Sequence, residues 1–358
     1  MSQVVRNGDQ GRDHDGQTAQ GEFKMTFKTA RHTLAALSAS VAFLGGTQAM
    51  AESITVAYFL EWPMPFEYAK QMGTYEKEMG VEINWVTFES GVKMSAAMAS
   101  GDVHLSVSQG LPPFVVATSA GQDLQMLDVA VSYADNDNCV VQSALEITKD
   151  NAAELAGKKV AVPLGTAAHY GFLKQMEHFG VDITTMEVVD MDPPDGAAAF
   201  AQGSVDMFCG WGGSLRRALE SGNVLITGDE KTELGILVFD VTSGPSGWVS
   251  ENGDLVAKFL KVTADANAMW ADPANHAEML PIIAKDAGMD EAATAETMAT
   301  FSFPTVEDQL GAKWLGGNAQ TFMKGVADVF IQAGSIDAAL DSYDSTVNTA
   351  PLAAAGKM

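Results

Sequence analysis

The sequence predicts an α/β protein of two lobes, each a mainly parallel sheet flanked by helices, with a two-strand hinge between them. First, short apolar strands alternate with helices from residue 53 onward, which is the pattern of domains built on parallel sheets. Second, the polar stretch 132–138 interrupts that alternation, and a strand at 235–240 is predicted to return to the first lobe. Third, residues 96–106 and 198–208 resemble each other, as expected of two lobes with similar topology.

The strands of the first lobe are apolar runs, as expected where helices cover both faces of a sheet. Glycines mark the ends of the helices between them, because glycine readily takes the left-handed conformation that ends a helix. The predicted strands are 53–59, 81–88, 103–107 and 124–131, and the predicted helices are 66–79, 92–100 and one that ends at Gly121.

The second lobe and the remainder of the first continue this pattern. Predicted strands begin at Cys139 and cover 160–162, 186–189 and 205–209, and predicted helices end near Gly180, Gly203 and Gly222. Further helices are predicted at about 252–270, 273–287, 291–300 and 318–333, with one short helix within 337–358. The predicted division is 1–51 for an N-terminal extension and signal peptide, 52–135 and 238–358 for the first lobe, and 136–237 for the second.

The N-terminal region has the pattern of a secretory signal peptide. Lys28 and Arg31 precede an apolar run at 33–44 that is too short to span a bilayer comfortably, and Ala49-x-Ala51 follows as a cleavage site. The polar residues before Met25 do not suit a signal peptide, so Met25 is the expected start. We therefore expect cleavage near Ala51 and a mature protein outside the cytoplasm.

The composition excludes one class of partner and favours one class of ligand. The chain has 358 residues, of which 47% are hydrophobic and 19% charged, with a net charge of −25. Nucleic acid is not an expected partner, because binding to its phosphates requires a basic surface. An acidic protein accepts a zwitterion more easily than a bare anion. We expect a monomer.

No catalytic or metal-binding motif stands out. Cys139 and Cys209 lack the spacing of a zinc site, and the sequence is compatible both with a disulfide between them and with two separate thiols. The chain has no nucleophile elbow, phosphate-binding loop or dinucleotide fingerprint. We therefore expect a binding protein with no cofactor and no metal, and not an enzyme.

The stretch 158–172 is the strongest candidate for an anion site. A strand, a turn at 163–165 and a helix that begins at Thr166 follow one another, and a helix start offers unpaired amides and partial positive charge. His169 and Tyr170 add donors one turn later. An ordinary strand, turn and capped helix is the alternative interpretation of the same residues.

The other predicted strand ends supply groups suited to a cation. Ligands in open α/β sheets lie at the carboxyl ends of the strands. Aromatic faces and carboxylates there can hold an ammonium group. The alternative interpretation is that the tryptophans at these strand ends only pack in the core. Asp192, which also follows a predicted strand, would then be a turn residue and not a ligand partner. The candidate ligand-binding residues are Trp62, Gln109, Gly110, Asp137, Asn138, Thr166, His169, Tyr170, Trp211 and Asp240.

Residues 54 to about 333 resemble the periplasmic substrate-binding proteins of ABC importers for taurine and other sulfonates, within the nitrate/sulfonate/taurine group. The similar segments are 54–58, 99–103, 159–170 and 205–225, together with Asp240. This resemblance implies the two-lobed type II periplasmic binding protein fold, closing over a small zwitterionic sulfonate and delivering it to membrane permease subunits. It also implies that Thr166, His169 and Tyr170 hold the sulfonate, Trp211 walls the pocket and Asp240 pairs with the ammonium.

Three segments depart from the family pattern and leave the ligand open. The loop 61–65 is bulkier and richer in proline, residues 212–214 lack the usual Ala-Pro, and 164–166 contain an additional glycine. Taurine or a close aminosulfonate is the lead prediction. Another sulfonate, nitrate, a betaine-like zwitterion or a pyrimidine is the alternative, and a plain anion would have no use for Asp240. Pyrimidine synthases share the fold, but the absence of a Cys/His cluster disfavours an enzyme.

Overall fold

The structure is a computed structural model that describes residues 53–133 and 135–358. The predicted extension and signal peptide at 1–51, with the start at Met25 and cleavage near Ala51, lie outside the described residues. The described residues form one compact unit. None of the helices within 53–133 and 135–358 is long and apolar enough to cross a membrane.

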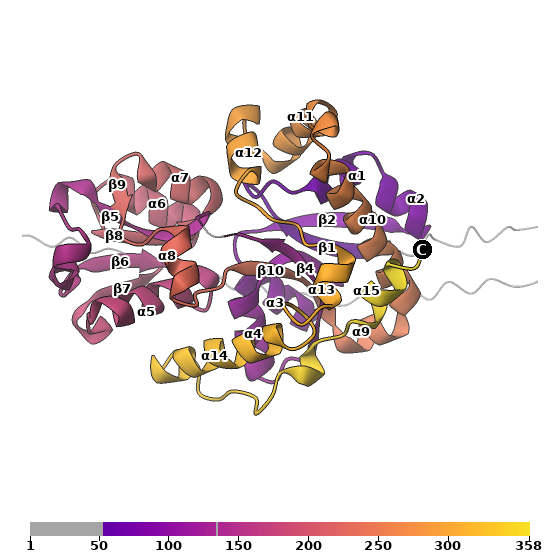
Figure 1. The fold of residues 1–358 in the computed structure, drawn as a ribbon. Helices are drawn as coiled ribbons and strands as arrows, with labels where there is room; N and C mark the ends of the chain where they lie inside the picture. Colours follow the sequence, from indigo (N-terminus) through magenta and orange to yellow (C-terminus); the bar gives the residue numbers. More distant parts are fainter. Residues whose placement is uncertain (1–52, 134) are drawn as a thin grey trace, which may run out of the picture. The chain divides into compact units, whose positions relative to one another are not determined.

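Two five-stranded sheets organise this unit, which confirms the predicted α/β class (Figure 1). The first sheet has the order β2-β1-β3-β10-β4 and the second has the order β7-β6-β8-β5-β9. The strands of the first are β1 Ser53–Phe59, β2 Glu82–Phe88, β3 Leu105–Gly110, β4 Leu124–Ser132 and β10 Phe239–Pro245. Those of the second are β5 Asp137–Gln142, β6 Lys159–Val162, β7 Glu187–Asp190, β8 Met207–Trp211 and β9 Gly222–Val224.

The two sheets share one topology. In each, the fourth strand in spatial order runs antiparallel to both of its neighbours: β10 in the first sheet and β5 in the second. The pairs β1–β2, β1–β3, β6–β7 and β6–β8 are parallel. The segments that resemble each other in sequence end in β3 and β8, which hold the same place in the two orders.

Helices cover the faces of both sheets (Figure 1). Between strands of the first sheet lie α1 Pro65–Gln71, α2 Thr74–Met79, α3 Gly91–Ser100 and α4 Leu111–Ser119. The second sheet is accompanied by α5 Ala167–Phe179, α6 Pro193–Ala201, α7 Gly212–Leu219 and α8 Gly228–Glu233. The C-terminal part contains α9 Ser246–Glu251, α10 Gly253–Ala271, α11 His276–Ala287, α12 Glu291–Met298, α13 Val306–Leu310, α14 Asn318–Gln332 and α15 Ala350–Ala355. Short 3-10 turns are η1 Ser143–Leu145, η2 Lys149–Leu155, η3 Ile183–Thr185, η4 Pro273–Asn275 and η5 Asp344–Thr346.

Two predicted elements are wrong. The single helix predicted at 66–79 is two helices, because Gly73 takes a left-handed backbone (φ 64°) that separates α1 from α2. The strand predicted at 235–240 begins only at Phe239 and continues to Pro245, because residues 235–238 belong to the crossing between the sheets. The sequence analysis also missed β9, α8, α9 and α13, which are short and follow polar stretches.

The chain passes between the sheets twice, after β4 and before β10. The two crossing segments are hydrogen-bonded to each other, since the Tyr133 amide donates to the Val238 carbonyl at 3.0 Å. The strands beside them are fully buried at positions such as Val129, Val140 and Val241. This arrangement has the form of the predicted two-strand hinge, and we retain the division at 135 and 237 as a proposal.

Candidate functional site

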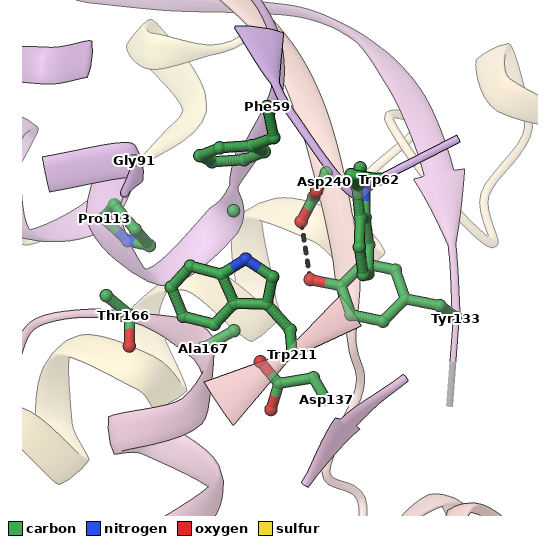
Figure 2. A pocket seen from close by; sticks show the side chains of 11 residues that line it. Phe59, Trp62, Gly91, Pro113, Tyr133, Asp137, Thr166, Ala167, Trp211 and Asp240 are labelled. Atoms are coloured by element: carbon green, nitrogen blue, oxygen red, sulfur yellow. Dashed lines mark hydrogen bonds between the residues drawn. The ribbon is translucent and has the colours of Figure 1, made fainter. Parts of the chain in front are cut away.

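A cavity with an empty volume of about 290 Å³ lies where strand ends of both sheets meet. The strand ends β1, β3 and β8 and the starts of β5 and β10 all contribute to it (Figure 2). Its walls therefore combine segments that lie more than 150 residues apart in the chain. The lining residues are Phe59, Trp62, Gly91, Gly110, Pro113, Tyr133, Asp137, Thr166, Ala167, Trp211 and Asp240.

Two aspartates occupy matching places in this cavity. Asp240 lies near the start of β10 and pairs with Gly110 at the end of β3. Asp137 begins β5 and pairs with Trp211 at the end of β8. Because β10 and β5 are the antiparallel strands, their starts lie beside the carboxyl ends of their parallel neighbours. The shared topology thus brings one carboxylate from each sheet to the same cavity.

Asp240 is held by two hydrogen bonds. The Tyr133 hydroxyl donates to Oδ1 at 2.6 Å, and the Ser108 hydroxyl donates to Oδ2 at 2.7 Å. Trp62 Nε1 donates in turn to Ser108 Oγ at 2.8 Å. Burial raises the pKa of Asp240 to about 7, against the effect of the two hydrogen bonds, and the nearby charge of Asp137 raises it further.

Ser108 adopts a left-handed backbone (φ 70°), which is unfavourable for a residue with a Cβ. That conformation places its hydroxyl between Trp62 and Asp240. Local strain of this kind is typical of sites that fix a functional group. Together with Tyr133, Ser108 therefore orients the Asp240 carboxylate.

Asp137 is equally buried but only partly satisfied. Its Oδ2 has no hydrogen-bond partner among the described residues. Its backbone carbonyl accepts a hydrogen bond from the buried Lys231 ammonium. Burial raises the pKa of Asp137 to about 7, and the positive charge of Lys231 opposes that rise. An unpartnered carboxylate oxygen in a cavity is a site at which a ligand N–H can bind.

Helix starts supply the opposite charge. Gly91, Gly110, Ala167 and Trp211 stand at the N-terminal ends of α3, α4, α5 and α7, and all four line the cavity. The first amides of a helix are unpaired and carry partial positive charge.

Among these helices, α5 is the best placed to bind an anion. It has 13 residues, whereas α4 has two prolines in its first turn that lack an N–H. The Thr166 hydroxyl accepts from the His169 amide at 3.3 Å and donates to the Pro163 carbonyl at 2.6 Å. This capping role was one of the two interpretations of Thr166 in the sequence. The amides at the start of α5 are therefore better anion donors than the Thr166 hydroxyl.

Six of the ten sequence-predicted residues meet at this cavity, and four do not. Trp62, Gly110, Asp137, Thr166, Trp211 and Asp240 line it. The four whose side chains do not are Gln109, Asn138, His169 and Tyr170.

The side chains of His169 and Tyr170 point away from the cavity because they lie on the face of helix α5 that packs against α14. The His169 ring stacks on Phe330 of α14 at 5.3 Å, and the Tyr170 ring meets Phe322 edge-on at 5.7 Å. Burial lowers the pKa of His169 to about 4, so its imidazole is neutral at pH 7. The Gly165 amide donates to His169 Nδ1 at 3.2 Å. His169 thus fixes the turn before α5, and its predicted contact with a ligand stays a prediction.

Gln109 and Asn138 point away because each is adjacent to a cavity residue in a strand, and neighbours in a strand face opposite sides. Gln109 Nε2 donates to the Gly91 carbonyl at 2.9 Å. Asn138 Nδ2 donates to the Ile226 carbonyl at 2.8 Å. Both side chains therefore brace backbone near the cavity, and their predicted contact with a ligand stays a prediction.

The sequence analysis missed Phe59 and Tyr133. Phe59 is the last residue of β1 and has the sequence context of a core aromatic, whereas Tyr133 lies in the polar stretch 132–138. The available signal was that Phe59 ends a predicted strand and that Tyr133 precedes Asp137 in the crossing.

Cys139 and Cys209 form a disulfide between the directly paired positions of β5 and β8. This resolves the two possibilities that the sequence left open. The bond ties the strand that begins with Asp137 to the strand that ends with Trp211. Among the described residues no group of His, Cys, Asp and Glu could hold a metal ion.

Comparison with known proteins places the chain in a wider context. The profile of the NMT1/THI5-like family matches residues 64–315. The chain is 26% identical over 325 residues to the taurine-binding periplasmic protein of Escherichia coli, covering 90% of this chain and 98% of that protein. It is 26% identical over 208 residues to a putative aliphatic sulfonates-binding protein of the same organism, covering 58% of this chain and 63% of that protein.

Solved structures share the fold. The periplasmic aliphatic sulphonate binding protein of Escherichia coli superimposes with a TM-score of 0.66 at 23% identity, over 81% of this chain and 95% of that one. The periplasmic nitrate-binding protein of Synechocystis superimposes with a TM-score of 0.67 at 14% identity, over 86% of this chain and 89% of that one. At these identities the structures establish the fold, which agrees with the predicted two-lobed architecture.

Proposed function

The chain belongs to the NMT1/THI5-like family, and from this premise we propose that it is the substrate-binding component of an ABC importer. It captures taurine or a close aminosulfonate by closure of its two lobes and delivers the ligand to membrane permease subunits. Relatives named as a taurine-binding periplasmic protein and a putative aliphatic sulfonates-binding protein support this assignment.

The observation that carries the proposal is the meeting of two buried carboxylates with helix starts in one cavity. Asp240 and Asp137 provide negative charge on the side of the antiparallel strands. The start of α5 at Ala167 provides amides and positive potential. A small molecule with an ammonium at one end and a sulfonate at the other satisfies both.

Charge complementarity favours a zwitterion over a plain anion. Bringing a bare sulfonate or nitrate beside two buried carboxylates would raise their repulsion at short range. An ammonium on the ligand instead stabilises both carboxylates in their ionised form. A charge-assisted hydrogen bond to a carboxylate is also stronger than one between neutral groups.

The disulfide supports a location outside the cytoplasm. Disulfides persist in oxidising compartments, among them the bacterial periplasm. The taurine-binding relative carries the word periplasmic in its name, and a signal peptide ending near Ala51 would deliver the chain there. We propose a periplasmic monomer that acts without cofactor and is not an enzyme.

The alternatives keep the scaffold and change the ligand. Another sulfonate or nitrate would use the start of α5 and leave Asp240 and Asp137 without a partner. A betaine-like zwitterion would bring positive charge but no N–H for Asp137 Oδ2. A neutral pyrimidine would bring no positive charge to Asp240 and Asp137.

A thermal-shift screen tests the proposal. The chain would be melted with taurine, hypotaurine, isethionate, glycine betaine, nitrate and sulfate, each in excess. A ligand that binds only the native state raises the melting temperature by mass action. We expect a rise with taurine and hypotaurine. A rise with isethionate or nitrate alone would remove the zwitterion from the account, and no rise with any of the six would contradict the proposed function.

A further inference from the structure

Two aromatic side chains separate the inner cavity from a larger groove. Phe59 of β1 and Trp211 of β8 line both spaces, and the outer groove has an empty volume of about 1220 Å³. Their ring centroids are 6.2 Å apart at an interplanar angle of 55°. Figure 2 shows the Trp211 indole between Phe59 and Asp137. We call this pair the aromatic wall.

The chain around the aromatic wall is closely fitted. Glu61 follows Phe59 by two residues, has a left-handed backbone (φ 54°) and donates its amide to the Ala287 carbonyl at 2.8 Å. A Cβ on Gly212 would lie 2.7 Å from the Glu61 carbonyl oxygen, and one on Gly213 would lie 2.2 Å from Glu61 Oε2. The glycines that replace the usual Ala-Pro therefore allow this loop to approach the start of α7.

Ion pairs join the two sides of the outer groove. Arg217 Nη1 of α7 lies 3.0 Å from Glu61 Oε1 and 3.1 Å from Oε2. Lys93 Nζ of α3, which also lines the groove, lies 2.7 Å from Oδ2 of Asp192, which precedes α6. Each pair links a segment of the first sheet to a segment of the second. The Glu61–Arg217 pair lies nearer the aromatic wall in sequence, two residues from Phe59 and six from Trp211.

From this arrangement we infer that Phe59 and Trp211 determine ligand length, and that the Glu61–Arg217 pair holds them together. With a two-carbon aminosulfonate in the inner cavity, each further methylene would push into the contact between the two rings. This inference rests on the proposed function and deepens it, because it names the size class of the ligand. Phe59 acts as a specificity-determining residue that the sequence analysis did not identify.

The test is a chain-length series measured by titration calorimetry. Taurine and homotaurine, which is one methylene longer, form one series, and ethanesulfonate and butanesulfonate form a second without the amine. The parent is expected to bind homotaurine at least about tenfold more weakly than taurine, since a methylene in a fitted pocket has an effect of this order. Phe59→Ala should reduce that ratio to within about threefold, because the removed ring leaves space for the methylene.

Phe59→Leu serves as a second variant in case Phe59→Ala does not fold, and should give an intermediate ratio. Arg217→Met should accelerate taurine release by about two- to fivefold, as expected for an exposed ion pair. Arg216→Met is its matched control on the same helix and should leave the release rate unchanged. Equal acceleration by both variants would overturn the role of the Glu61–Arg217 pair.

The two series separate this inference from the proposed function. An unchanged ratio in Phe59→Ala, or equal binding of taurine and homotaurine by the parent, would overturn the inference while leaving the function intact. A steep dependence on length among plain alkanesulfonates without taurine binding would overturn the zwitterionic ligand and support the aromatic wall. Absence of binding in both series would overturn both.

Discussion

Asp240 and Asp137 occupy matching positions in the two sheets, yet their surroundings differ. Each lies at the start of the antiparallel strand beside the end of the third strand in spatial order. Asp240 accepts hydrogen bonds from Tyr133 and Ser108, whereas Asp137 Oδ2 has no partner among the described residues. The first sheet thus presents an oriented carboxylate, and the second presents one with an open acceptor.

This difference shows how one topology can serve two parts of a recognition task. An oriented carboxylate gives direction to an ion pair at little reorganisation cost. An open acceptor in a buried place is unfavourable until a donor arrives, so its satisfaction is coupled to ligand binding. We propose that Asp240 supplies most of the affinity for the ammonium and that Asp137 adds discrimination for a ligand with N–H groups.

The largest expected effect is that of Asp240→Asn. Loss of a buried, hydrogen-bonded charge partner should weaken taurine binding by roughly a hundredfold or more. Because Tyr133 and Ser108 would compete for one amide oxygen, the ligand-free protein should also lose about 1–3 kcal/mol of stability. Calorimetric titration and chemical denaturation measure the two effects.

Asp128→Asn is the matched control for that experiment. Asp128 is buried on β4, accepts the Thr242 amide at 2.9 Å and does not line the cavity. Its substitution should change stability with little change in taurine affinity. Equal losses of affinity in the two variants would show that Asp240 acts through the fold and not through the ligand.

The second expected effect concerns the disulfide, which braces the strand of Asp137. Replacing Cys139 and Cys209 together by alanine should lower the free energy of unfolding by about 2–4 kcal/mol. Taurine affinity should fall less than in Asp240→Asn, since neither sulfur lines the cavity. Denaturant unfolding of the double variant and of the reduced parent measures the stability. Unfolding curves identical to those of the oxidised parent would contradict this role.

A third, smaller effect is expected of Asp137→Asn. It should weaken taurine binding by roughly tenfold, because one of two negative partners is lost while an acceptor oxygen remains. Stability of the ligand-free protein should change less than in Asp240→Asn, since Asp137 Oδ2 has no hydrogen-bond partner within 53–133 and 135–358 to lose. If this variant loses more affinity than Asp240→Asn, the two roles in the comparison must be exchanged.

The smallest effect is expected of Tyr133→Phe. Removal of one hydrogen bond to Asp240 should weaken taurine binding by a factor of about five to ten. That hydrogen bond lowers the pKa of Asp240, so its removal should raise the pKa and move the pH dependence of binding to higher pH. Binding measured from pH 6 to 8 tests this, and an unshifted profile would show that Tyr133 only packs against Trp62.

The sequence predicted much of this site because strand ends can be located from apolar runs and glycines. Trp62, Gly110, Asp137, Trp211 and Asp240 all follow or begin such runs, and the structure places them together.

The differences between the predicted residues and the residues that line the cavity have a geometric cause. Whether Gln109 or Gly110 faces the cavity depends on the phase of the strand, which a short apolar run does not determine. The direction of His169 depends in the same way on the packing of α5 against α14. Phe59 was missed because an aromatic residue at a strand end has the same sequence pattern as a core residue.

The most direct test of the account is a count of protons released when taurine binds at pH 7. With pKa values of about 7, Asp240 and Asp137 are each about half protonated in the free protein, and both must ionise to hold an ammonium. Titration calorimetry in two buffers of different ionisation enthalpy gives the number. We predict that about one proton leaves per taurine bound and that isethionate releases none. Taurine binding without proton release would contradict the claim that the two buried carboxylates recognise the ammonium group.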